Sequence, residues 1–79
     1  METNQFINDF AELFEETESS FFKPGTKFRD IEEWSSLGAL SVIAMIDEKY
    51  NVRLTGDDLR NSLTIEDIYN IVKIKANNP

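Results

Sequence analysis

Two consecutive serines, Ser35 and Ser36, directly precede a long apolar segment and are the hydroxyl groups best placed for chemistry. A serine in a hydrolase needs a neighbouring base to take its proton, and histidine is the usual base. The chain contains no histidine, and no lysine stands close to the two serines in sequence. Ser36 is therefore not expected to be the nucleophile of a hydrolase. On spacing alone the pair is typical of a helix N-cap, where a side-chain oxygen accepts a hydrogen bond from a free backbone N–H.

The remaining side chains offer little catalytic chemistry. Because the chain has no cysteine, it has no disulfide, no thiolate nucleophile and no cysteine zinc site. Asp57 and Asp58, with Asp47 and Glu48 in the vicinity, could attract a divalent cation. Their segment lacks the alternating oxygen ligands of an EF-hand loop, which favours a solvated acidic face over a metal site. We expect no metal site and no catalytic centre within the chain.

Size and charge restrict the class of protein and its partners. The 79 residues allow one small domain, expected to span residues 1–79, and a hydrophobic content of 41% is ordinary for a folded chain. Fifteen acidic residues against eight basic ones give a net charge of −7, which repels nucleic acid and anionic membranes and favours basic protein surfaces. The most apolar stretch, residues 37–46, is too short to span a membrane. We expect a soluble, cytoplasmic protein that is monomeric.

Two helices and a long loop are predicted in the first part of the chain. Residues 3–17 carry an apolar stripe at three- and four-residue spacing, formed by Phe6, Ile7, Phe10, Leu13 and Phe14. Residues 18–35 break this period at Pro24 and Gly25. This loop nevertheless holds five large apolar side chains: Phe21, Phe22, Phe28, Ile31 and Trp34. We expect it to pack onto the domain.

The second helix is predicted over residues 36–50. Its buried stripe is expected to consist of Leu37, Leu40, Ile43, Ala44, Ile46 and Tyr50. Val42 and Met45 fall towards the other side of the helix. Asn51 suits the helix C-cap, where a left-handed residue is common.

A short helix and a last long helix follow. Residues 52–54 read as extended, and residues 55–58 as a turn into a brief helix near residues 57–61. Thr64 opens the last helix, and Asp67 three residues later completes a pair that resembles a capping box. The apolar face of that helix is Ile65, Ile68, Ile71, Val72 and Tyr69. The predicted fold class is all-α: a small four-helix bundle with three main helices, one short helix and a long first loop.

The chain resembles the acyl carrier proteins, a family of phosphopantetheine-binding carrier domains. In that family an Asp-Ser-Leu motif starts the second helix, which ends in acidic residues and an aromatic; here Ser35-Ser36-Leu37 and Asp47-Glu48-Lys49-Tyr50 stand at these places. The third helix of the family is short, and a threonine followed by an apolar residue and an acidic residue opens the fourth, as in residues 63–67. Length, loop pattern and helix order agree over essentially all 79 residues.

The resemblance implies a covalent prosthetic group on Ser36. A separate phosphopantetheinyl transferase, with its own Mg²⁺, would transfer 4′-phosphopantetheine from coenzyme A to this hydroxyl. The terminal thiol of the arm would hold acyl groups as thioesters and present them to enzymes of fatty-acid or specialised acyl and polyketide biosynthesis. The phosphodiester would lie at a helix N-terminus, which favours an anion. The chain would be a carrier used by separate enzymes, and not itself an enzyme.

Two groups of residues around the arm follow from the same resemblance. Partner enzymes with basic docking surfaces are expected to contact Leu37, Leu40, Met45, Asp47 and Glu48. A cavity for the acyl chain is expected between the helices, lined by Phe6, Phe28, Ile43, Ile46, Ile65 and Ile68. The same six residues also fit an ordinary hydrophobic core, and the sequence does not separate the two interpretations.

Three positions depart from the family pattern. Ser35 stands where the family usually has an aspartate that helps engage the transferase and its metal. Gly38 and Ser41 stand where fatty-acid carriers are often acidic. These departures favour a specialised carrier whose partners differ from the general fatty-acid enzymes. They also leave a second hypothesis open: an unmodified protein-interaction module that keeps the carrier fold without a prosthetic group.

Overall fold

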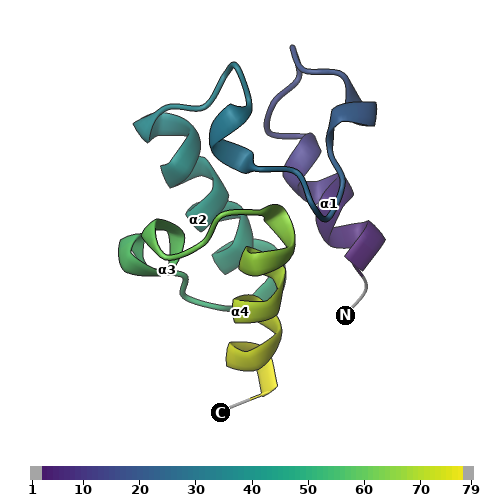
Figure 1. The fold of residues 1–79 in the computed structure, drawn as a ribbon. Coiled ribbons are helices and arrows are strands. Elements are labelled where there is room, and N and C mark those ends of the chain that lie inside the picture. Colours follow the sequence, from purple (N-terminus) through teal and green to yellow (C-terminus); the bar gives the residue numbers. More distant parts are fainter. Residues whose placement is uncertain (1–2, 78–79) are drawn as a thin grey trace.

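The computed structural model describes residues 3–77, which form a small helical domain (Figure 1). Its α-helices are α1 Thr3–Ala11, α2 Ser36–Tyr50, α3 Gly56–Arg60 and α4 Ile65–Asn77, and two 3₁₀ turns, η1 Ser19–Phe21 and η2 Phe28–Asp30, lie between α1 and α2. Over this range no strand is present, and the one isolated bridge joins Lys27 to Thr64. The predicted all-α class is confirmed. No helix among the described residues is long and apolar enough to cross a membrane.

The first helix is shorter than predicted, since it ends at Ala11 and not at residue 17. Beyond this point the backbone tightens, and the N–H of Phe14 donates to the carbonyl of Ala11 at 3.0 Å. Such i→i+3 bonds turn the side chains more sharply than an α-helix does. Phe14 thereby becomes 3% exposed and joins an aromatic cluster with Phe10, Phe22 and Trp34.

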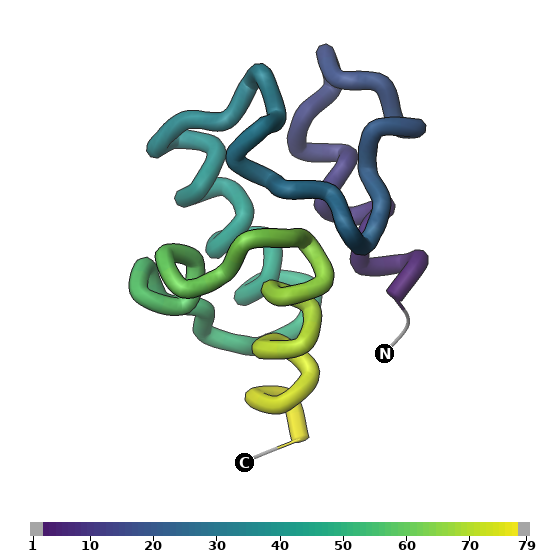
Figure 2. The backbone as a smooth tube through the Cα atoms, viewed as in Figure 1, coloured from purple at the N-terminus to yellow at the C-terminus, as the bar shows by residue number. Residues whose placement is uncertain are grey.

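The α1–α2 loop, residues 12–35, packs onto the domain as predicted. Figure 2 shows it in blue, running across the end of the molecule opposite the C-terminus. Four of its apolar side chains are buried: Phe14, Phe22, Phe28 and Ile31. The N–H of Ile65 donates to the carbonyl of Thr26 at 3.0 Å, so the loop satisfies a free donor at the start of α4.

Helix α2 begins and ends as predicted, but its buried face is predicted only in part: Ile46 is buried, and Ile43 and Tyr50 are partly buried against the core, whereas Leu37, Leu40 and Ala44 are exposed. The core residues are Val42, Met45 and Ile46, which are 0–6% exposed, whereas Leu37 is 73% and Leu40 is 62% exposed. The first eleven residues of the helix carry no charge, so apolar side chains lie on nearly every face and the period alone does not select one. The orientation is decided by packing into the common core that α2 shares with α1, the loop and α4.

Local hydrogen bonds set the boundaries of the other helices. Asn51 ends α2 in the left-handed region, at φ 55°, as predicted for a C-cap. Thr55 and Asp58 form a capping box at the start of α3. The predicted pair of Thr64 and Asp67 is confirmed at the start of α4, with reciprocal bonds of 3.0 and 3.2 Å. The core face of α4 consists of Ile65, Ile68, Tyr69 and Val72, with Ile71 partly buried.

Candidate functional site

The two serines at the start of α2 have different tasks. Ser35 lies outside the helix in an extended conformation, and its Oγ accepts the N–H of Gly38 at 3.2 Å. Ser36 is the first helical residue and is exposed. Its hydroxyl makes no hydrogen bond with any of residues 3–77. Because Ser35 provides the cap, the Ser36 hydroxyl stays available to an external reagent.

The surroundings of Ser36 suit an anion. The positive end of the α2 dipole lies here, and the first turn of the helix contains no acidic residue that would neutralise it. An anion attached at this point is stabilised by about 0.3–1 kcal/mol. A phosphate group on Ser36 therefore fits the local electrostatics.

A groove of about 450 Å³ opens beside Ser36, between α2 and α3. This volume lies within the range of small-molecule sites in proteins. The α2 wall is formed by Ser36, Ala39, Leu40 and Ile43. The opposite side is formed by Gly56, Leu59 and Arg60 of α3 together with Arg29 and Trp34 of the loop. The groove thus has apolar walls, one free hydroxyl and two guanidinium groups.

Arg29 fixes the α3 wall of this groove. Its guanidinium donates to the carbonyl of Leu59 at 2.8 Å and to the carbonyl of Ser62 at 2.7 Å, and it lies 4.7 Å from the ring centre of Phe28. The first carbonyl lies in the last turn of α3 and the second just beyond its end, where a cation is favourable. Nothing in the sequence pattern singled out Arg29, because its partners lie about thirty residues further along the chain.

Exposed apolar side chains stand next to the serine. Leu37 and Leu40, one turn apart on α2, form what we call the leucine ridge. Asp47 and Glu48, also expected to contact partners, are exposed near the other end of α2. Met45 is part of the same predicted partner surface, but this prediction is wrong, since Met45 is 6% exposed and belongs to the core. The exposed apolar surface next to Ser36 therefore consists of the leucine ridge alone, and Met45 does not contribute to it.

Five of the six residues expected to line an acyl cavity are fully buried. Each of them has 0% exposure and belongs to one packed core: Phe6, Phe28, Ile46, Ile65 and Ile68. Ile43 is the exception, since it is half-buried and lines the groove beside Ser36. A chain that entered between the first five would have to displace packed side chains.

Gly38 allows a close approach between α2 and the loop. A Cβ atom at this position would lie 3.2 Å from Cε1 of Phe14, which is tighter than ordinary van der Waals contact. Any side chain at position 38, acidic or not, would press on the aromatic cluster. The sequence signal was a glycine inside a helix, which costs about 1 kcal/mol relative to alanine and points to a packing reason.

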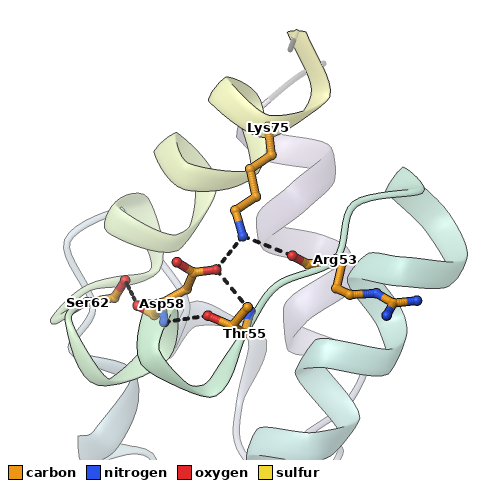
Figure 3. Close-up of polar contacts among 5 residues, drawn as sticks. All are labelled: Arg53, Thr55, Asp58, Ser62 and Lys75. Atoms are coloured by element: carbon orange, nitrogen blue, oxygen red, sulfur yellow. Dashed lines mark hydrogen bonds and ion pairs between the residues drawn. The ribbon is translucent and has the colours of Figure 1, made fainter. Parts of the chain in front are cut away.

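The acidic pair after the α2–α3 connection, Asp57 and Asp58, is engaged by cations of the chain, and Figure 3 shows the contacts of Asp58. Lys75 Nζ donates to Oδ2 of Asp58 at 2.6 Å and to the carbonyl of Arg53 at 2.9 Å, and Asp57 pairs with Arg60 at 2.5 Å. Burial alone would raise the pKa of Asp58, but hydrogen bonds from Lys75 and Thr55 lower it below its usual value. Among the described residues, no group of three or more acidic side chains could hold a metal ion.

A second polar cluster, missed by sequence reasoning, joins α1 to α2. Asp9 is 5% exposed and accepts hydrogen bonds from Tyr50 Oη at 2.6 Å, Gln5 Nε2 at 3.0 Å and Lys49 Nζ at 3.3 Å. Burial would raise the pKa of Asp9, but these donors lower it. Burial and the neighbouring carboxylate raise the pKa of Tyr50. With every partner supplied from within the domain, the cluster is structural.

No known family model matches the chain, and no curated protein matches its sequence.

Proposed function

We propose that the chain is an acyl carrier protein that bears 4′-phosphopantetheine on Ser36. The observation that carries the proposal is the exposed Ser36 hydroxyl at the first residue of α2, free of hydrogen bonds to residues 3–77, while Ser35 caps the helix. The favourable helix end and the adjoining groove add support, since both accommodate a phosphorylated group. A transferase would supply the chemistry of attachment, so the missing local base is no obstacle.

The arm would contribute the thiol that the chain itself lacks. That thiol would hold acyl groups as thioesters for fatty-acid or specialised acyl and polyketide enzymes. The protein's own residues would serve recognition: the leucine ridge offers apolar contact beside the arm, and Asp47 and Glu48 offer charges to basic partner surfaces. For the cargo, the closed core argues for contact along the groove at Ile43.

A second function has one specific observation in its favour. Ser35 keeps the cap but carries no carboxylate, and the first turn of α2 contains no acidic residue. If the transferase depends on such a charge, the chain would be an unmodified interaction module that docks through the leucine ridge. The two functions differ in a single chemical property, namely whether Ser36 accepts the arm.

An assay for attachment of the arm (loading) distinguishes the carrier from the unmodified interaction module. The purified protein is incubated with coenzyme A, Mg²⁺ and a broad-specificity phosphopantetheinyl transferase, and its intact mass is measured. The carrier proposal predicts a gain of one phosphopantetheine unit that Ser36→Ala abolishes and Ser35→Asn, which keeps a capping side chain, does not. No gain with several transferases, while a control carrier is modified, would favour the interaction module.

A further inference from the structure

Basic side chains are scarce in this protein, yet two of them line the groove beside Ser36. The chain has eight lysines and arginines against fifteen acidic residues, and the groove contains Arg29 and Arg60. The α2 wall contributes no charge of its own, because residues 36–46 are all uncharged. An acidic protein thus places two positive charges in the same groove as the hydroxyl that is proposed to carry an anionic group.

We infer that Arg60 holds the phosphodiester of the Ser36 arm and thereby draws the base of the arm into the α2–α3 groove. The inference rests on the proposed function, since it requires the arm. A guanidinium offers paired N–H donors that match phosphate oxygens. A phosphodiester stays negatively charged at neutral pH, so the attraction persists under working conditions.

Arg60 is free to change partners at little cost. Its side chain is 75% exposed, and its present partner Asp57 is 76% exposed. Exposed ion pairs of this kind contribute about 0–1 kcal/mol, so a phosphodiester with a helix N-terminus behind it competes well with the carboxylate.

Arg29 has a different part in the same arrangement. Two of its N–H groups are taken by the carbonyls of Leu59 and Ser62, which ties its charge to the end of α3. Arg29 therefore acts as a positioning residue that keeps the last turn of α3, and Arg60 with it, against the groove. The apolar side chains of Leu40, Ile43 and Leu59 would then lie along the arm.

The experiment compares three proteins: wild type, Arg60→Gln, and Arg53→Gln as a control with the same change in charge. Arg53 is exposed, and its side chain extends away from α3 in Figure 3, while its backbone carbonyl keeps the contact with Lys75. Each protein is first loaded from coenzyme A and checked by intact mass. Absence of loading in the wild type would overturn the proposed function and this inference together.

The loaded proteins are then examined in two ways. Amide ¹H–¹⁵N spectra before and after loading report contact of the arm with residues 56–60, and the rate at which a bulky maleimide alkylates the thiol reports how freely the arm moves. We expect loading to shift the α3 amides in wild type and Arg53→Gln but not in Arg60→Gln. The alkylation rate should rise about two- to fivefold in Arg60→Gln alone, as the loss of one exposed ion pair implies.

Salt provides an independent check, because exposed ion pairs are screened when the ionic strength rises. The wild-type α3 shifts should shrink in high salt. A loaded wild type whose α3 amides do not move, or an Arg60→Gln variant whose shifts equal those of the wild type, would overturn the inference while leaving the proposed function intact.

Discussion

Replacing Gly38 by alanine should destabilise the domain, although alanine is the better helix former. The change in helix propensity favours alanine by about 1 kcal/mol. The new Cβ, however, would lie 3.2 Å from Cε1 of Phe14. That ring is 3% exposed and is enclosed by Phe10, Phe22 and Trp34, with ring centres 5.7, 6.2 and 5.9 Å away. Overpacking costs about 1–3 kcal/mol, so a net loss of about 1 kcal/mol is expected.

A second substitution isolates the contact with Phe14. Leucine at position 14 has no atoms where the phenylalanine ring meets α2, so Phe14→Leu relieves the crowding. In that background Gly38→Ala should stabilise the protein by about 1 kcal/mol, the value of helix propensity alone. The effect of Gly38→Ala on the free energy of unfolding would then differ by about 2 kcal/mol between the wild-type and the Phe14→Leu background. A coupling of this size is typical of residues in contact.

Urea unfolding of the four proteins in this cycle measures the free energies. If Gly38→Ala stabilised the wild type as much as it stabilised Phe14→Leu, the ring would have room to move. Packing against Phe14 would then not explain why position 38 is a glycine.

Three further predictions concern polar groups. Tyr50→Phe should lower the free energy of unfolding in urea by about 1–3 kcal/mol, because it removes the 2.6 Å hydrogen bond to the buried Asp9. Since the folded pKa of Asp58 lies below the usual 3.8, the stability it contributes is present above that pH and is lost as the pH falls through the folded pKa. Thermal melts across the acidic range should show this loss, and Lys75→Met should reduce it; equal acid sensitivity in both proteins would contradict the assignment. Ser35→Asp should retain the cap, leave stability within about 0.5 kcal/mol, and raise the rate of loading measured by mass at short times.

The helix boundaries could be predicted where capping is local. Ser35 and Asn51 delimit α2, and Thr64 with Asp67 opens α4, through contacts within four residues along the chain. The end of α1 could not be predicted in this way. The stripe continues to Phe14, and the tighter backbone that ends the helix depends on aromatic partners far along the chain.

The candidate site was predictable only in part. Ser36 is marked by its place at the start of an apolar helix, and the structure leaves it exposed there. The orientation of α2 was not predictable, because Leu40 and Met45 fit the helical period equally well. The groove brings together residues from three separate segments, and Arg29 reaches α3 across about thirty residues of sequence. Such long-range contacts leave no periodic signal in the chain.

The central claim is that Ser36 carries the prosthetic arm. The most direct measurement is to produce the protein in cells together with a broad-specificity phosphopantetheinyl transferase and to map the modification by fragment mass spectrometry. The carrier account predicts one phosphopantetheine unit, located on Ser36. A protein that remains unmodified beside a fully modified control carrier, or an arm found on Ser35 or Ser41, would contradict it.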